Sequence, residues 1–343
     1  MESPKTFIKK REETLDVETI VKGILKGERA SLARAITLIE SEKTSHRKIG
    51  QHLLKEILPY TGNSMRIGIT GIPGAGKSTF IDKFGTLLIE KGYKVAVLTI
   101  DPTSPFSHGS ILGDKTRMEE LAKKEEAFIR PSPTGGHLGG VHRKTREAIL
   151  ICEAAGFDII IIETVGVGQS ETDIRSMTDI TLLLTITGSG DDLQGMKKGI
   201  METADLIIVT KADGENRINA LKAKKELEQV LKIFPQQSES SLPKVYAASS
   251  LTGEGFEEIW EGIQVFFQQV KLEGEFFKRR QNQLKDWLQG SLKEQLLYSF
   301  YSVDDLQKEY ERLEELVVSG KLPVTEASEQ LLNHFFEAIQ KRK

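Results

Sequence analysis

The sequence has a single cysteine, Cys152, and no apolar run long enough to cross a bilayer. One cysteine excludes an intrachain disulfide, a CxxC metal knuckle and a pair of redox thiols. Because Cys152 falls on the apolar side of a segment with helical spacing, we expect it in the core. The N-terminal segment MESPKTFIKKREETLDVE mixes acids with bases and lacks the apolar core of a signal peptide. We therefore expect a cytoplasmic protein with no membrane partner.

An excess of one charge is also missing. The 343 residues include 47 Lys plus Arg and 50 Asp plus Glu, which leaves a formal net charge of -3. A nucleic-acid-binding protein usually carries a basic stripe, so this balance argues against a nucleic-acid partner. With 38% hydrophobic residues, the chain can bury a sizeable core, and its length allows roughly two domains of about 150 residues each.

Short apolar runs alternate with amphipathic segments in the middle of the chain. The runs are typical of buried strands and lie at 66–70, 95–100, 158–163, 180–186, 205–210 and 244–249. The segments with helical spacing lie at 78–92, 115–125, 141–155, 215–233 and 254–270. Such alternation predicts an α/β fold with a doubly wound, mainly parallel sheet.

The two ends of the chain have apolar residues at helical spacing and no strand-like runs. We expect an N-terminal helical extension over 1–64, a main domain over 65–272 and a helical C-terminal region over 273–343. The apolar row in the last region fits either packing onto the main domain or a dimer interface.

The sharpest motif is GIPGAGKS, which fits GxxxxGK[ST] and lies between a predicted strand and a predicted helix. Its glycines allow a tight turn whose N–H groups face phosphates, Lys77 supplies positive charge, and Ser78 offers a hydroxyl to Mg²⁺. The motif predicts a nucleotide site formed by Gly71, Pro73, Gly74, Ala75, Gly76, Lys77, Ser78 and Thr79.

Three acids are candidates to hold Mg²⁺ together with Ser78. Glu163 ends a predicted strand and is followed by Thr164-Val165-Gly166, where P-loop proteins place a metal-binding acid and a γ-phosphate sensor. Asp101 ends another strand, and Asp114 precedes a predicted helix. Each also has a simpler interpretation: a strand-end acid for Glu163, a turn residue for Asp101 and a helix cap for Asp114.

The base is expected to bind after the fifth predicted strand, at Thr210-Lys211-Ala212-Asp213. The Asp213 carboxylate can accept hydrogen bonds from N1–H and N2–H of guanine, which adenine lacks, while the Lys211 stem lies along the base. The usual signature is NKxD, and Thr210 replaces its asparagine, so we expect weaker affinity but retained guanine preference. A second loop on the base side is predicted at Ser249, Ser250 and Leu251.

A glycine-rich segment at 188–199 has an acidic pair followed by two lysines and is suited to a moving element. Lys197 is a candidate to stabilise charge in the transition state, although a solvated loop is the simpler interpretation. Gln169 either orients the attacking water or serves only local packing.

Over residues 32 to 270 the chain resembles the MeaB/ArgK family of P-loop GTPases. This family provides chaperones of adenosylcobalamin-dependent methylmalonyl-CoA mutase. The segments that carry the resemblance are GIPGAGKST, IDPTSPFSHGSILGDKTRM, ETVGVGQSE and GSGDDLQGMKKGIMETADLIIVTKADG.

The resemblance implies a Mg²⁺-dependent GTPase with Asp101, Asp114 and Glu163 around the metal. It further implies switches at 104–117, 164–176 and 191–198, a mutase of the acyl-CoA type as partner, and a homodimer formed by a C-terminal helical arm. Two alternatives are a kinase for a basic amino-acid-binding transport protein and a metallochaperone GTPase, although the second would require His-rich or CxxC segments that the sequence lacks. Thr210 and the TGSG at 187–190 depart from the family pattern.

Overall fold

The computed structural model describes most of the chain and divides it into two compact units. The described residues are 16–41, 43–101, 117–133, 138–164, 174–188, 204–233 and 243–341. The first unit is Met1–Arg280 and the second is Gln281–Lys343. The nucleotide motifs all belong to the first unit.

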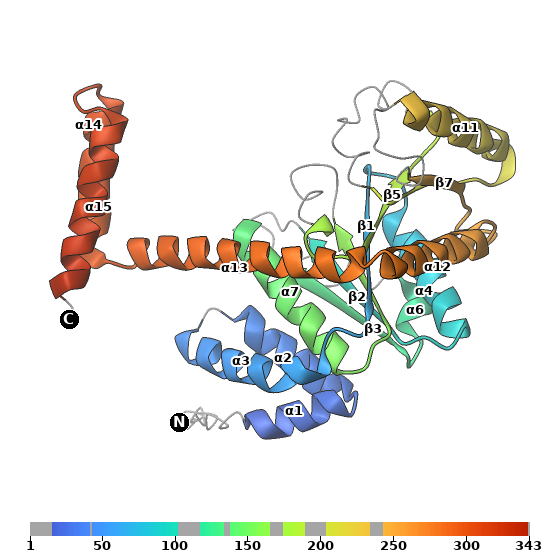
Figure 1. The fold of residues 1–343 in the computed structure, drawn as a ribbon, viewed down its shortest axis with the longest axis horizontal. Helices are drawn as coiled ribbons and strands as arrows, with labels where there is room; N and C mark the ends of the chain where they lie inside the picture. Colours follow the sequence, from blue (N-terminus) through green and yellow to red (C-terminus); the bar gives the residue numbers. More distant parts are fainter. Residues whose placement is uncertain are drawn as a thin grey trace, which may run out of the picture. The chain divides into compact units, whose positions relative to one another are not determined.

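The first unit is built on a seven-stranded sheet with the strand order β3-β2-β4-β1-β5-β6-β7. Every neighbouring pair in it is parallel (Figure 1). The strands are β1 (Met65–Gly71), β2 (Val95–Asp101), β3 (Ala127–Pro133), β4 (Ile159–Thr164), β5 (Ile180–Thr185), β6 (Leu206–Val209) and β7 (Lys244–Ala247). The predicted doubly wound parallel sheet is confirmed, and the carboxyl ends of its strands meet along one edge.

One strand, β3, was not predicted from the sequence. It contains Pro131 and Pro133 and has no continuous apolar run. Proline cannot donate to a sheet ladder and is tolerated mainly on edge strands. β3 lies at the edge of the sheet and pairs with β2 alone, so the prolines fit there.

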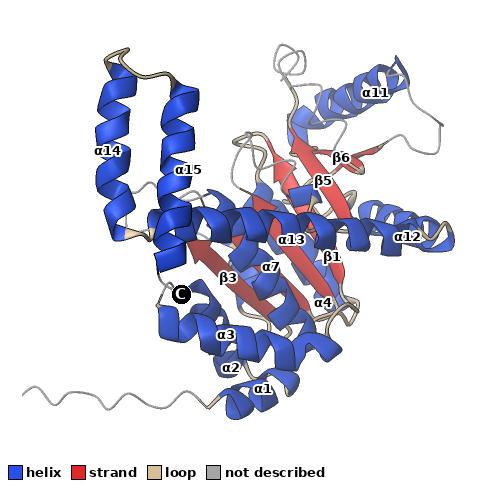
Figure 2. Ribbon diagram, turned by 60° about the vertical axis from the view of Figure 1, so that its left-hand side comes forward, coloured by secondary structure: helices blue, strands red, loops and turns tan. Residues whose placement is uncertain are grey.

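Helices cover both faces of the sheet (Figure 2). The cluster on one face joins α4 (Lys77–Glu90), α6 (Glu119–Ala122) and α12 (Phe256–Leu272) to the strands. The opposite face packs against α1 (Val17–Leu25), α2 (Arg29–Glu40), α3 (Thr44–Ile57) and α7 (Leu138–Ala154). A third cluster joins α11 (Arg217–Ile233) to β5, β6 and β7. Two short 3-10 helices are η1 (Leu58–Tyr60) and η2 (Gly214–Asn216).

The inner strand β4 shows why four consecutive isoleucines form a strand. Ile159 and Ile161 belong to the cluster on one face, whereas Ile160 and Ile162 belong to the cluster on the other. Successive side chains of a strand point to opposite faces, so a strand covered on both sides is apolar throughout. Cys152 is fully buried in the second cluster, as expected, and burial raises the pKa of its thiol.

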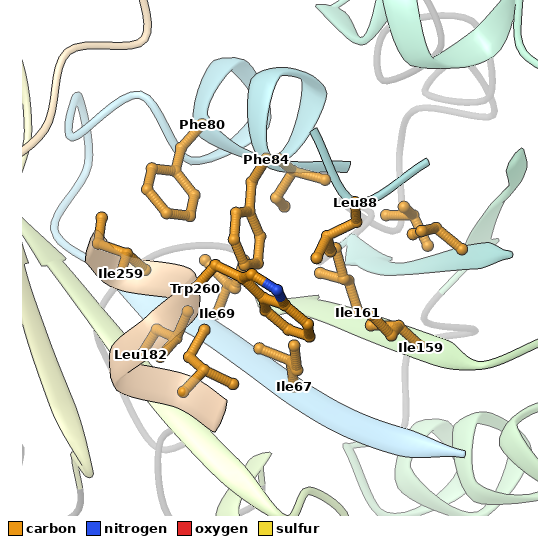
Figure 3. Packing of buried hydrophobic residues seen from close by; sticks show 14 of the residues in the cluster. Ile67, Ile69, Phe80, Phe84, Leu88, Ile159, Ile161, Leu182, Ile259 and Trp260 are labelled. Atoms are coloured by element: carbon orange, nitrogen blue, oxygen red, sulfur yellow. The ribbon is translucent and has the colours of Figure 1, made fainter. Parts of the chain in front are cut away.

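The helix that follows the phosphate-binding motif is fixed to the sheet by aromatic packing. Phe80 and Phe84 of α4 point toward β1 and toward α12, where Trp260 closes the cluster (Figure 3). The Phe80 and Phe256 rings stack with centroids 4.9 Å apart. This packing holds the start of α4 at the end of β1.

The second unit is helical. It contains most of α13 (Glu275–Tyr301) together with α14 (Asp304–Val318) and α15 (Val324–Lys341). α14 and α15 pack through a small cluster of Val303, Leu306 and Phe335. A row of leucines on α13 at spacings of four is more than half exposed, namely Leu284, Leu288, Leu292 and Leu296. Within the described ranges, no helix combines the length and apolar character needed to cross a membrane.

A buried ionic cluster lies at the start of α13, inside the first unit. Arg280 donates through Nε and Nη2 to the two carboxylate oxygens of Asp179, at 2.8 and 2.7 Å. The Asp179 side chain is 1% exposed and also accepts the N–H of Arg66 at 2.8 Å. Arg279 pairs in the same way with Asp205, at 3.2 Å. These contacts attach the second turn of α13 to the sheet.

Candidate functional site

The phosphate-binding loop, residues 71–78, connects the end of β1 to α4. Gly71 has φ +154°, and a Cβ there would lie 2.3 Å from the backbone oxygen of Leu184 on the neighbouring strand. Gly74 and Gly76 have φ +81° and +77°, in the left-handed region that favours glycine. The loop therefore has the tight turn that the sequence predicted, and α4 begins at Lys77, the residue the motif requires there.

Lys77 reaches back over the loop. Its Nζ donates to the carbonyl of Gly71 at 2.9 Å and lies 3.4 Å from that of Ile72. Burial lowers the pKa of Lys77, and the negative charge of Glu163 opposes part of that shift. A cation that is partly withdrawn from water gains strongly from a phosphate, because little solvent screens the two charges.

Ser78 and Glu163 supply two oxygens on facing elements. The Ser78 hydroxyl donates to Oε1 of Glu163 at 3.1 Å, and Glu163 is 5% exposed at the end of β4. Hydroxyl and carboxylate oxygens are ligands that Mg²⁺ accepts, usually with several waters completing its shell.

The other predicted metal ligands lie beyond what the structure describes. Asp101 ends β2, but its side chain is outside the described residues, and Asp114 lies entirely outside them. In the described part of the chain, no three acidic, histidine or cysteine side chains gather as a metal site. Gln169 and Lys197 also lie outside the described residues, as do most residues of the predicted switches.

The predicted base-binding residues follow β6. Lys211 has φ +57°, and within the described residues it is the one position other than glycine with a positive φ. Asn216 supports this bend, because its Nδ2 donates to the Lys211 carbonyl at 2.7 Å while its Oδ1 accepts from Thr187 at 2.7 Å. Asn216 could not be predicted from the sequence, because its role depends on a turn that no motif specifies.

The structure brings Asp213 and the second predicted loop together. The fully buried Ser249 donates its hydroxyl to Oδ2 of Asp213 at 2.6 Å. The same oxygen of Ser249 accepts from the N–H groups of Leu251 and Thr252, at 3.2 and 3.1 Å. Ser249 thus positions the Asp213 carboxylate, while Ser250 is partly exposed and Leu251 is 80% exposed.

Thr210 links these two parts of the site. It is 2% exposed, and its hydroxyl lies 2.7 Å from the carbonyl of Ala75 in the phosphate-binding loop. The phosphate-binding loop and the segment that leads to Asp213 therefore lie next to each other at the carboxyl edge of the sheet. This is the edge where open α/β sheets bind ligands. Fold and site together define a P-loop nucleotide-binding protein.

Comparison with known proteins gives the family. Residues 32–305 match the family described as methylmalonyl Co-A mutase-associated GTPase MeaB, and the chain belongs to this family. "GTPase ArgK" of Escherichia coli (strain K12) is 44% identical over 321 residues, which cover 92% of this chain and 97% of the relative. "Methylmalonic aciduria type A homolog, mitochondrial" of Mus musculus is 44% identical and covers 93% of this chain and 79% of the relative.

A solved structure extends the likeness to the fold. The crystal structure of "LAO/AO transport system kinase" has 37% sequence identity and a TM-score of 0.73, and the match covers 96% of this chain and 99% of that chain. The resemblance to the MeaB/ArgK GTPases and the predicted fold class are both confirmed.

Proposed function

We propose that this protein is a Mg²⁺-dependent GTPase. The observation that carries the proposal is the Asp213 carboxylate, held by Ser249 at 2.6 Å on the same sheet edge as the phosphate-binding loop. A fixed carboxylate discriminates guanine from adenine by accepting N1–H and N2–H. Lys77 and the loop N–H groups bind the phosphates and stabilise the charge that moves during attack by water on the γ-phosphate.

Two oxygen-bearing side chains next to the phosphate-binding loop fit a magnesium ion. Ser78 and Glu163 would hold it, and we place Asp101 and Asp114 in the same role. When bound, Mg²⁺ neutralises charge on the β- and γ-phosphate oxygens. The protein's own contribution is to keep the Ser78 hydroxyl and the buried Glu163 carboxylate 3.1 Å apart, so that both oxygens face one small volume. We propose that Gln169 orients the attacking water and that Lys197 stabilises negative charge in the transition state.

Replacing Asp213 with asparagine is expected to lower GTP affinity on the order of a hundredfold, because two charge-assisted hydrogen bonds to the base are lost. ATP affinity should change little, so the GTP-over-ATP preference falls by the same factor. Fluorescence titration with both nucleotides measures this. Glu215→Gln makes the same charge change at an exposed neighbour and should leave the preference intact. Normal GTP selectivity in Asp213→Asn would remove the base assignment.

We propose that hydrolysis serves an adenosylcobalamin-dependent acyl-CoA mutase of the methylmalonyl-CoA type, by timing cofactor loading and protecting the enzyme. Support comes from the description of the family as mutase-associated. If the mutase favours one nucleotide state, linkage requires that it also shift nucleotide affinity.

We expect slow GTP hydrolysis by the protein alone and faster hydrolysis when a folded, cofactor-competent methylmalonyl-CoA mutase is added. Initial phosphate release with GTP, with ATP as control, measures both effects. A rate that a verified mutase does not change would count against the chaperone role while leaving the GTPase assignment standing. GTP and ATP hydrolysed at equal rates would instead count against the GTPase assignment.

We also propose that the protein is a homodimer formed through the second unit. The exposed leucine row on α13 is apolar surface of a kind that soluble proteins usually cover. Light scattering after size exclusion should give the mass of two chains, and Leu288→Glu should shift it toward one. A wild-type mass of one chain would remove this proposal.

A kinase is the second candidate, because the solved structure at 37% identity is that of "LAO/AO transport system kinase". In that case the γ-phosphoryl group would be transferred to a protein instead of to water. Incubation with γ-labelled GTP and a basic amino-acid-binding protein distinguishes the two: label on the protein favours the kinase, and label released only as phosphate favours the GTPase.

A further inference from the structure

We infer that Thr210 is a positioning residue for nucleotide binding: its buried hydroxyl orients the Ala75–Gly76 peptide of the phosphate-binding loop. The inference deepens the proposed function and rests on nucleotide binding at this loop. It also assigns a role to the residue that stands where the usual guanine signature has asparagine.

The hydroxyl of Thr210 has two backbone acceptors within reach but only one hydrogen to donate. The carbonyl of Ala75 is 2.7 Å away and that of Thr185 is 3.0 Å away. The Thr185 carbonyl already accepts the backbone N–H of Thr210 at 2.8 Å. The Ala75 carbonyl is the nearer acceptor, and the Thr185 carbonyl already accepts one hydrogen bond. Both facts favour donation of the hydroxyl hydrogen to Ala75. With the side chain 2% exposed, water does not compete for this hydrogen.

The loop needs such a restraint because its own backbone is permissive. Ala75 lies between Gly74 and Gly76, two glycines with φ near +80°, and glycine populates many other conformations at little cost. On either side, the N–H of Ala75 bonds to the Ile72 carbonyl at 3.2 Å, and the Gly76 carbonyl accepts from α4. The Ala75–Gly76 peptide between them is the one that Thr210 holds.

Fixing one end of a peptide fixes the other. The peptide unit is planar and trans, so its C=O and N–H point in opposite directions. When the Ala75 carbonyl points to Thr210, the Gly76 N–H points away from β6, as a loop that presents N–H groups to phosphates requires. Thr210 thereby acts on phosphate affinity, whereas base choice belongs to Asp213.

The test compares variants of residue 210 in the full-length protein. Thr210→Val keeps the branched shape and removes the hydroxyl, Thr210→Ser keeps the hydroxyl, and Thr210→Ala removes it with less volume. Thr181→Val is the matched control, because Thr181 is a 1% exposed threonine on β5 whose hydroxyl lies 3.3 Å from that of the nearby Thr178. Binding of GTP, GDP and ITP is measured by titration, with the melting temperature of the nucleotide-free protein.

We expect Thr210→Val to bind GTP, GDP and ITP about tenfold more weakly, the effect of one net hydrogen bond. The GTP-to-ITP ratio should not change, because base selection is untouched. Thr210→Ser should restore most of the affinity, and Thr181→Val should bind like wild type. If Thr210→Val does not fold, Thr210→Ala provides the same comparison.

Wild-type affinity in Thr210→Val, no recovery in Thr210→Ser, or an equal loss in Thr181→Val would each overturn the inference. Its failure is distinct from failure of the proposed function. If the wild type binds nucleotides without guanine preference, the GTPase proposal falls, but the effect of Thr210 on triphosphate affinity can still be measured. If the wild type prefers GTP and Thr210→Val matches it, only the inference falls.

Discussion

Replacing Lys77 with alanine is expected to weaken GTP binding on the order of a hundredfold or more, because it removes the cation that faces the phosphates. Nζ of Lys77 lies 2.9 Å from the Gly71 carbonyl, over the loop. Burial lowers the pKa of this lysine, which means that the folded state disfavours its charged form relative to the unfolded chain.

The sign of that shift gives the variant a second signature. A folded-state pKa below the unfolded value means that folding is penalised at neutral pH, where the lysine is charged, and that the penalty fades as pH rises through the folded pKa. Lys77→Ala removes the penalty, so the nucleotide-free variant should unfold at the same or a higher denaturant concentration than wild type. Lost binding with retained stability is expected where a residue serves function at some cost to the fold.

Lys91→Ala is the matched control for Lys77→Ala. Lys91 follows the last residue of the same helix and pairs with Glu257 at 2.7 Å on the surface, far along α4 from the loop. This variant should bind GTP like wild type. Titration with GTP and chemical unfolding of both proteins measure the two effects. A Lys77→Ala protein that binds GTP within a few fold of wild type would contradict the phosphate-site assignment.

The features of the fold and site that could be predicted from the sequence are those set by residues that are neighbours along the chain. The isoleucine run of β4 and the GIPGAGKS motif each specify local geometry, so the strand and the loop could be placed without a structure. β3 could not be placed, because its prolines obscure the strand pattern, and only its edge position makes them acceptable.

The rest depends on contacts between distant residues. From the sequence, Thr210 is predicted only to lack the two amide hydrogen bonds of the usual asparagine. In the structure its hydroxyl contacts the carbonyl of Ala75, which lies 135 positions away along the chain. Ser249 was expected on the base side, but its hydrogen bond to Asp213, 36 positions away, needed the sheet order to be known. Spacing along a chain carries no information on such pairs until the topology brings two strand ends together.

The largest effect on stability is expected at the ionic cluster that starts α13. Replacing Arg280 with methionine should lower the free energy of unfolding by about 3–5 kcal/mol, because it leaves the Asp179 carboxylate buried without its cation. Arg280 also donates to the backbone carbonyls of Gly62 and Ser64, each at 2.6 Å, so those acceptors lose their partner as well. Chemical unfolding of the full chain, followed by circular dichroism, measures the loss.

Arg312→Met is the control, since it also removes an arginine from an ion pair, with Glu309 at 2.6 Å. The Arg312 side chain is 55% exposed and the pair lies one turn apart on α14, where water screens both charges, so stability should change little. Asp179→Asn tests the same cluster from its acidic side. Both substitutions break the same Arg280–Asp179 ion pair. The double variant should therefore lose less free energy of unfolding than the sum of the losses in the two single variants. Strict additivity, or an Arg280→Met loss as small as that of Arg312→Met, would mean that the cluster does not hold the first residues of α13 to the sheet.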